Sequence, residues 1–127
     1  MSKKAIVTDK APAALGPYSA AVEAGNTIHV SGQLGIDPVT NKLAGDDVDR
    51  QTRQSLTNIK NILEAAGSSM VDVVESEVLL TDINDFDAMN KVYGEFFEAP
   101  YPSRCAFQVV ALPGNSKVEI KVVAVKG

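Results

Sequence analysis

Arg104 and Glu119 are the two residues of this chain whose types and positions best suit a chemical function. Arg104 stands at the start of an apolar run, and Glu119 stands inside the next apolar run along the chain. A charge beside a buried strand is costly unless a partner neutralises it. The two residues therefore either pair with each other, or one of them binds a ligand. On these two residues alone, a structural ion pair is the simpler interpretation.

The ligand-binding alternative has a clear chemistry. The planar guanidinium of an arginine can donate two parallel hydrogen bonds to a carboxylate, and it stays protonated at neutral pH. A nearby carboxyl group can transfer protons or orient a water molecule. Arg104 and Glu119 together would suit a site for a small carboxylic acid that undergoes acid/base chemistry.

The other potentially reactive side chains suggest no second site. Cys105 is the only cysteine, and His29 is the only histidine, flanked by Ile28 and Val30 on a different predicted strand. An isolated cysteine is usually a small buried hydrophobe, and a single histidine does not make a metal site. We therefore expect neither thiol catalysis nor a bound metal ion.

Length and composition narrow the class of protein. The chain has 127 residues, of which 45% are hydrophobic, and this predicts a single domain spanning residues 1–127. The net charge of −4 disfavours a nucleic-acid partner. The apolar stretches are too short for a signal peptide or a membrane span, and one cysteine cannot form an intrachain disulfide. These features predict a cytoplasmic protein.

Apolar periodicity and turn residues predict the order β-β-β-α-β-α-β-β. One amphipathic helix would begin with Asp46 or Asp47 as its N-cap and run to about Ala66, with Gly67 as its stop. A second would begin at Asn84 or Asp85, carry Phe86, Met89, Tyr93 and Phe97 on one face, and end at Pro100 and Pro102. Strands are predicted at 5–7, 18–24, 27–31, in the second half of 71–80, at 105–111 and at 117–125.

This order predicts an α+β two-layer domain, in which two helices cover one face of a mixed sheet. The final strand is apolar at nearly every position from Val122 to Val125, whereas a half-solvated strand would alternate. The sheet face away from the helices is therefore expected to be covered. Since no segment of the chain remains to cover it, we expect association with other subunits.

Four sequence blocks, in order along the chain, resemble the Rid family, also called YjgF or L-PSP proteins. They are Gly16-Pro17-Tyr18-Ser19; Val30-Ser31-Gly32-Gln33; Asp82-Ile83-Asn84-Asp85-Phe86 with Met89-Asn90 and Tyr93; and Pro102-Ser103-Arg104 with Ala111-Leu112-Pro113 and Val118-Glu119-Ile120. The blocks span nearly the whole chain. The resemblance implies a chorismate-mutase-like fold and a homotrimer whose sheets face inward.

The resemblance also implies an activity and a site. The family hydrolyses reactive 2-imino or enamine acids, such as 2-aminoacrylate, 2-iminopropanoate and 2-iminobutanoate, to 2-keto acids and ammonia, and it needs no cofactor. The implied catalytic residues are Arg104, which would bind the substrate carboxylate, and Glu119, which would handle protons and position the water. The implied substrate-binding residues are Tyr18, Ser31, Gly32, Asn90, Arg104, Cys105 and Ala106.

The expected strand pairing separates the two catalytic residues. If 105–111 and 117–125 form a hairpin, Arg104 lies opposite Ala124 or Val125, and Glu119 lies ~16 Å away at ~3.3 Å per residue. We therefore expect a site between subunits. One chain would provide Arg104 and Asn90, and the next would provide Tyr18, Ser31 and Glu119.

The chain also departs from the usual family pattern at Cys105, Gln108 and Val110, which leaves the substrate preference open. Two other functions are considered beside the deaminase. One is a non-catalytic regulator that binds a metabolite or a partner protein in the same cleft, and the other is an endoribonuclease. A binding module needs the arginine but not a proton-handling group, so Arg104 together with Glu119 favours the deaminase.

Overall fold

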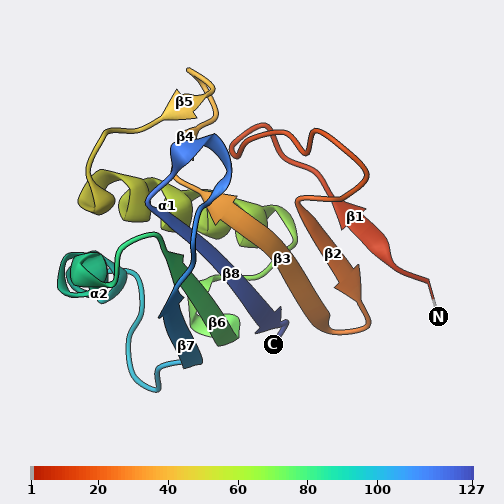
Figure 1. The fold of residues 1–127 in the computed structure, drawn as a ribbon. Helices are drawn as coiled ribbons and strands as arrows, with labels where there is room; N and C mark the ends of the chain where they lie inside the picture. Colours follow the sequence, from red (N-terminus) through yellow and green to blue (C-terminus); the bar gives the residue numbers. More distant parts are fainter. Residues whose placement is uncertain (1) are drawn as a thin grey trace.

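The computed structural model describes residues 2–127 as a six-stranded sheet covered by helices, with the strand order β1-β2-β3-β8-β6-β7 (Figure 1). The strands are β1 (Lys4–Ile6), β2 (Ala21–Ala24), β3 (Thr27–Leu34), β6 (Val73–Leu80), β7 (Ser103–Gln108) and β8 (Val118–Val125). The helices are α1 (Val48–Ala65) and α2 (Phe86–Tyr93). Short 3₁₀ turns occur at Met70–Asp72, Ile83–Asp85 and Pro113–Asn115.

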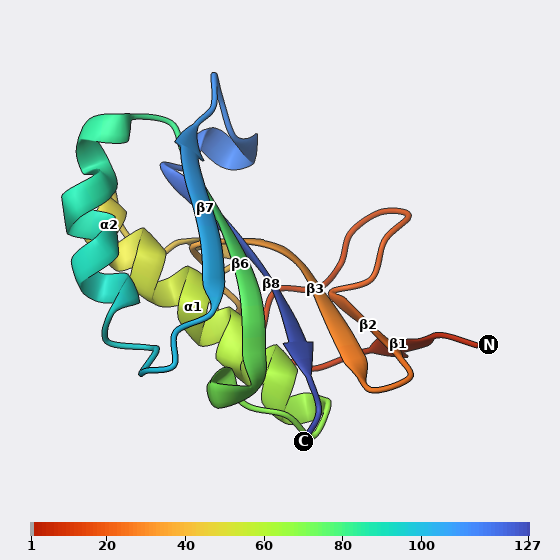
Figure 2. The ribbon, with the colours of Figure 1, turned by 90° about the horizontal axis from the view of Figure 1, so that it is seen from below.

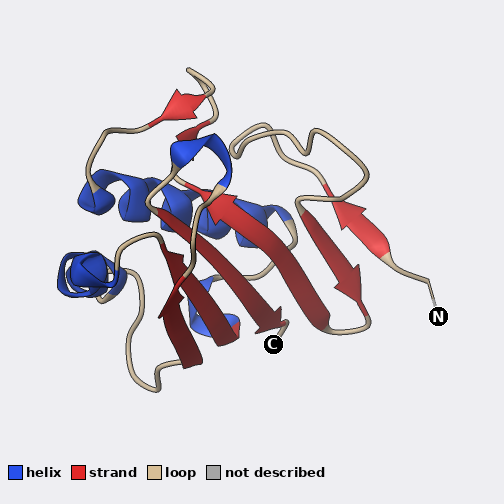
Figure 3. Ribbon diagram, viewed as in Figure 1, coloured by secondary structure: helices blue, strands red, loops and turns tan. Residues whose placement is uncertain are grey.

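The two helices lie side by side on one face of the sheet, and the opposite face of β6, β7 and β8 carries no helix (Figure 2). The predicted α+β two-layer architecture and the predicted element order are therefore confirmed. One addition was not predicted, a small two-stranded sheet of β4 (Ile36–Asp37) and β5 (Lys42–Leu43) in the connection from β3 to α1 (Figure 3).

α1 begins and ends where its sequence predicts. Asp47 is the N-cap, and its carboxylate accepts a hydrogen bond of 2.7 Å from the backbone N–H of Arg50. The helix stops at Ala66, and Gly67 follows with φ +80°, a backbone conformation that glycine adopts without strain. The apolar side of α1 packs on the sheet through fully buried side chains, among them Leu56, Ile59, Ile62 and Leu63.

α2 is shorter than its predicted extent. It ends at Tyr93, followed by Gly94, and so stops well before Pro100. Glycine has a low helix propensity, and here it ends the helix before the prolines can. Phe97 therefore lies outside the helix, but its side chain is still buried and stacks on Tyr93 with ring centroids 4.5 Å apart.

The predicted hairpin between the last two strands is wrong. β7 pairs in parallel with β6, while β8 inserts between β3 and β6 and runs antiparallel to both. The burial of each strand explains why β8, and not β7, lies in the centre of the sheet. Alternate residues of β8 from Val118 to Ala124 are almost completely buried, which suits a central strand. Most residues of β7 are exposed, which suits an edge.

β3 is longer than predicted and contains a β-bulge. Val30 is opposite Val122, and Gln33 is opposite Ile120, so two residues of β3 face the single intervening residue of β8. Such a bulge shifts the alternation of side chains by one residue. As a result Gln33 is buried on the helix-covered face.

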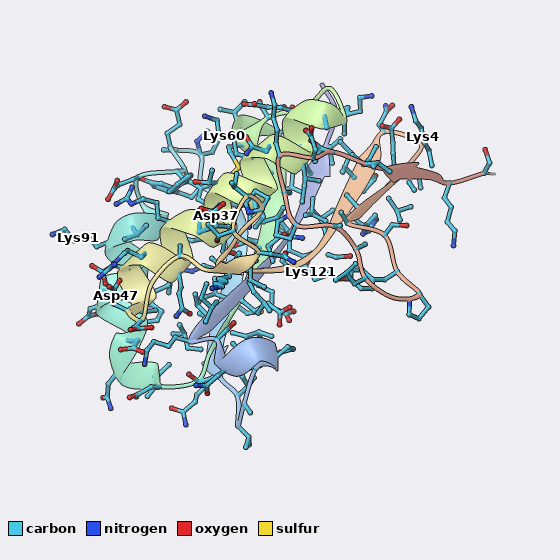
Figure 4. All side chains as sticks on the ribbon, turned by 90° about the horizontal axis from the view of Figure 1, so that it is seen from above. Lys4, Asp37, Asp47, Lys60, Lys91 and Lys121 are labelled. Atoms are coloured by element: carbon cyan, nitrogen blue, oxygen red, sulfur yellow. The ribbon has the colours of Figure 1, made fainter. Side chains whose placement is uncertain are left out.

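The surface carries charges of both signs. Figure 4 shows Lys4, Lys60, Lys91 and Lys121 on four different elements, spread around the molecule. Three ion pairs occur among residues 2–127, including Arg53 with Glu95 at 2.9 Å, and all three are at least partly exposed. Within the same residues, no helix combines the length and the hydropathy that a bilayer crossing requires.

Candidate active site

Arg104 lies on the edge strand β7, with its side chain on the helix-covered face of the sheet. It is opposite Ser76 of β6, which is buried beneath α2. The Nη1 group of Arg104 donates a hydrogen bond of 2.7 Å to Oδ1 of Asn90. The guanidinium carbon lies 4.7 Å from the ring centroid of Tyr93 and 5.5 Å from that of Phe86, within the range of cation–π attraction.

α2 supplies all three contacts to Arg104 because their spacing places them on one helical face. Phe86, Asn90 and Tyr93 are related as i, i+4 and i+7. The hydroxyl of Tyr93 is also hydrogen-bonded to the buried Oγ of Ser76 at 2.7 Å, which fixes the ring beneath the guanidinium. We call Arg104, Asn90, Phe86 and Tyr93 the arginine half-site.

Sequence reasoning assigned only Asn90 and Arg104 of this group. The roles of Phe86 and Tyr93 were missed, although their spacing from Asn90 already put the three side chains on one side of the predicted helix. The aromatic pair was assigned to the apolar face of that helix and to the family sequence blocks, but not to the site.

The guanidinium of Arg104 is available to a ligand. Among residues 2–127, no carboxylate lies within ion-pairing distance of it, so the structural pair with Glu119 does not form within the chain. A cavity of about 480 Å³ adjoins the guanidinium and is lined by Asn90, Tyr93, Gly94, Tyr101, Pro102 and Arg104. Only one of the arginine's N–H groups is used by Asn90, and the others can bind a carboxylate.

Glu119 lies on the central strand β8 and faces the opposite side of the sheet. Its neighbours Val118 and Ile120 are completely buried beneath the helices, so strand alternation turns Glu119 to the helix-free face. Gly32 of the bulge lies against the carboxylate, since a Cβ atom at that position would be only 2.5 Å from Oε2. Partial burial raises the pKa of Glu119 above its ordinary value of 4.5.

The bulge also connects Glu119 to the loop before β2. The hydroxyl of Ser31 donates a hydrogen bond of 2.6 Å to the carbonyl of Ser19, and its backbone N–H bonds to the carbonyl of Ala20 at 2.9 Å. Tyr18 is 56% exposed and lines, together with Gly32, a cavity of about 160 Å³. We call Glu119, Gly32, Ser31 and Tyr18 the glutamate half-site.

The two half-sites are separate within one chain. Arg104 is opposite Ser76, which is opposite Val122, three residues beyond Glu119 on β8. Two strand spacings and three residues along the strand place the Cα atoms about 14 Å apart, and the two side chains lie on opposite faces of the sheet. The predicted separation was therefore of the right size, although the hairpin from which we derived it does not exist.

Cys105 and Ala106 follow Arg104 on β7 and alternate in direction. Cys105 is opposite Glu77 and exposed, on the face opposite to the guanidinium of Arg104. Ala106 is on the helix-covered face, where it is partly buried against the core. Neither lines the cavity of about 480 Å³ beside the guanidinium, but Cys105 and Arg104 both line a second cavity of about 230 Å³. Among residues 2–127, no group of three or more His, Cys, Asp and Glu side chains is arranged to hold a metal ion.

Comparison with known proteins places this chain in one family. The family model described as endoribonuclease L-PSP matches residues 8–126. The 2-iminobutanoate/2-iminopropanoate deaminases of Capra hircus and Homo sapiens are 50% and 46% identical to the chain, over 98% of its length and 91% of theirs. The crystal structure of Escherichia coli TdcF with bound serine has a TM-score of 0.93 and 42% identity, covering 98% of this chain and 99% of that one. The chain belongs to the L-PSP family, whose members are also known as Rid or YjgF proteins.

Proposed function

We propose that the protein is a deaminase that hydrolyses 2-imino acids and their enamine tautomers, such as 2-iminopropanoate and 2-iminobutanoate, to 2-keto acids and ammonia. The observation that carries the proposal is the arginine half-site. An exposed guanidinium is held by an amide and two aromatic rings, and no carboxylate of residues 2–127 pairs with it. Such a group is prepared to bind the carboxylate of a small acid.

The chemistry then requires one proton-handling group. The iminium carbon is already electrophilic, so water adds to it while ionised Glu119 accepts one proton from that water. Glu119 returns the proton to the nitrogen, and the C–N bond breaks to release ammonia. As the ketone forms, Glu119 takes the proton of the hydroxyl and passes it to the ammonia. Iminium ion and water thus give 2-keto acid and ammonium ion. The raised pKa of Glu119 suits a group that both accepts and returns a proton.

The separation of the half-sites supports a site shared by two subunits of a homotrimer. In this proposal Arg104 and Asn90 of one subunit face Tyr18, Ser31, Gly32 and Glu119 of the next. The helix-free face of the sheet would be buried in the same assembly, because it exposes apolar side chains such as Phe107 and Val125, which are 46% and 41% exposed in the single chain.

A coupled assay tests the reaction. Threonine dehydratase would generate 2-iminobutanoate, and the decay of the imine would be followed with the wild-type protein, Arg104→Ala and Glu119→Ala. We expect the wild-type protein to accelerate the decay and both substitutions to abolish the acceleration. A wild-type protein that leaves the decay unchanged would instead favour a metabolite-binding regulator that uses Arg104 as its anchor.

Mixing the two inactive variants tests the shared site. If each site takes Arg104 from one subunit and Glu119 from the next, random mixed trimers of Arg104→Ala and Glu119→Ala subunits contain about a quarter of intact sites. Activity should therefore return on subunit exchange, and each variant alone should stay inactive. Light scattering coupled to gel filtration would report the number of subunits, and a monomer would contradict the proposal.

An endoribonuclease is the second candidate, because the matching family model carries that description. The net charge of −4 and the dispersed lysines give it little electrostatic support (Figure 4). Cleavage of a labelled RNA that falls steeply with added salt, and that Glu119→Ala leaves intact, would favour it over the deaminase.

A further inference from the structure

α1 presents polar side chains to the sheet at three positions where apolar ones would pack without any need of hydrogen bonds. Gln51, Ser55 and Asn58 are related as i, i+4 and i+7, and each is at most 1% exposed. A buried polar group destabilises the fold unless it is hydrogen-bonded. We call these three residues the polar stripe of α1, and their partners indicate its role.

Ser55 and Asn58 hold β3 just after its bulge. The hydroxyl of Ser55 donates a hydrogen bond of 2.6 Å to the carbonyl of Gln33. Nδ2 of Asn58 donates to the carbonyl of Ile36 at 2.9 Å and approaches that of Leu34 at 3.4 Å. The end of the strand is thereby attached to the helix directly beyond Gly32.

Gln51 holds the start of β8. Its Oε1 accepts a hydrogen bond of 2.8 Å from the backbone N–H of Lys117, two residues before Glu119. Its Nε2 donates to the carbonyl of Gly45 at 2.9 Å. The backbone of Gln51 also lies directly against Gly35, where an added Cβ would be 2.4 Å from the Gln51 carbonyl oxygen. One turn of α1 is therefore attached both to β8 and to the end of β3.

We propose that the polar stripe of α1 is a set of positioning residues for Glu119, which fix β3 and β8 so that Gly32 stays in contact with its carboxylate. The stripe acts from the helix-covered face and touches neither half-site directly, so it does not take part in catalysis itself. Its catalytic consequence rests on the proposed role of Glu119.

Gln51 offers a matched set of variants. Gln51→Met keeps the approximate length of the side chain but removes both hydrogen bonds, whereas Gln51→Glu keeps the oxygen that accepts from Lys117. Thr52→Val is the control, because Thr52 is the next residue on α1, is completely buried, and has a hydroxyl without a hydrogen-bond partner among residues 2–127.

The kinetic expectation separates kcat from KM. A small displacement of a catalytic group costs about 10-fold or more in rate, so Gln51→Met should lower kcat by about that factor. Its KM should stay within about twofold, because the carboxylate anchor Arg104 lies on a different strand. Gln51→Glu keeps the acceptor for Lys117 but loses the donor to Gly45, so it should recover only part of kcat. Thr52→Val should change neither constant.

A second readout does not depend on activity. The pKa of Glu119 would be measured by ¹³C NMR of its carboxyl group. Other titratable side chains on the same face include Lys121 of β8, Glu77 opposite it on β6 and His29 farther along β3, and Tyr18 lines a cavity together with Gly32. Gln51→Met changes no charge. A change in the pKa of Glu119 in this variant therefore shows that the surroundings of the Glu119 carboxylate have changed. We expect that pKa to fall toward its ordinary value as the carboxylate gains water, and to stay unchanged in Thr52→Val.

The outcomes separate this inference from the proposed function. If the wild-type protein does not hydrolyse imino acids, the proposed function fails, while the NMR comparison still decides the positioning role. An unchanged pKa of Glu119 in folded Gln51→Met, or a loss of kcat that Thr52→Val reproduces, would overturn the inference. If circular dichroism shows that Gln51→Met does not fold, Ser55→Ala takes its place, with smaller effects in the same directions. No effect of Ser55→Ala on either readout would then overturn it.

Discussion

The arginine half-site and the glutamate half-site are built in different ways. In the arginine half-site, the guanidinium of Arg104 is positioned by other side chains, namely Asn90 and the aromatic rings of α2. In the glutamate half-site, the carboxylate of Glu119 lies against the backbone of Gly32, which a β-bulge places there. Single substitutions should therefore affect the first half-site locally, whereas the second depends on how two strands are paired.

The half-sites also differ in how they respond to pH. A guanidinium stays charged throughout the range in which proteins are stable. The pKa of Glu119 is raised by partial burial, so its ionisation changes closer to neutrality. Substrate binding should therefore depend little on pH through Arg104, and catalysis should depend on it through Glu119.

The largest effect is expected from removing the anchor. Arg104→Ala should lower kcat/KM by about 1,000-fold, the order of magnitude found when one partner of a buried charged pair is removed. Arg104→Lys should recover only part of the loss, because an ammonium group cannot form two parallel hydrogen bonds to a carboxylate. Steady-state kinetics with enzymatically generated 2-iminobutanoate would measure both variants. Equal activity of Lys and Ala variants would show that the geometry of the guanidinium has no role.

Glu119→Gln should have the next largest effect, on kcat rather than KM. Removal of a general acid/base costs about 100-fold or more. In the wild-type protein, kcat should rise with pH through the pKa of Glu119, which lies above 4.5. This rise of kcat with pH should be absent from the residual activity of Glu119→Gln. If it persists in the variant, it is caused by the ionisation of another group.

Glu119→Gln should also stabilise the fold. A carboxyl group whose pKa is raised in the folded state binds its proton more tightly there than in the unfolded chain. The free energy of unfolding therefore falls as the pH rises from about 4.5 through the folded-state pKa, and it stays lower above that point. Glu119→Gln removes this loss, so its gain in Tm over the wild-type protein should be larger at pH 8 than at pH 4, as measured by calorimetry.

Only Asn90 and Arg104 of the arginine half-site were assigned, through the family resemblance, although three of its four residues are local to α2. Helical spacing places Phe86, Asn90 and Tyr93 on one face, and Arg104 begins a recognisable strand. Periodicity also predicted α1, both ends of which depend on nearby residues, Asp47 and Gly67. Interactions of this kind are encoded within a few turns of chain.

The glutamate half-site could be predicted only in part, because its geometry is non-local. Apolar periodicity identifies a strand but not its neighbours, so β8 was assigned next to β7 instead of between β3 and β6. The bulge arises from the number of residues between two pairings, Val30 with Val122 and Gln33 with Ile120. One partner of Gln51, Lys117, follows it by 66 residues and lies just before β8, and the other, Gly45, lies in the loop before α1.

Gly32→Ala tests the backbone-based half-site with the smallest possible change. Gly32 has no positive φ, so alanine is not strained there, and the three atoms nearest to an added Cβ all belong to the side chain of Glu119. The carboxylate should move aside, lowering kcat by about 10-fold with KM nearly unchanged. A variant with normal kcat would show that contact between Gly32 and Glu119 is dispensable.

The smallest effect is expected from Tyr93, and it separates the two roles of that side chain. Tyr93→Phe keeps the ring beneath Arg104 but leaves the buried hydroxyl of Ser76 without its partner, so it should cost about 1 kcal/mol of stability and leave KM nearly unchanged. Tyr93→Leu also removes the cation–π contact, and KM should rise by about three- to fivefold. Because Glu119 lies on the other face of the sheet, kcat should change little in either variant. A fall in kcat that exceeds the rise in KM would mean that the two half-sites are coupled through the sheet, and that binding and chemistry cannot be assigned to them separately.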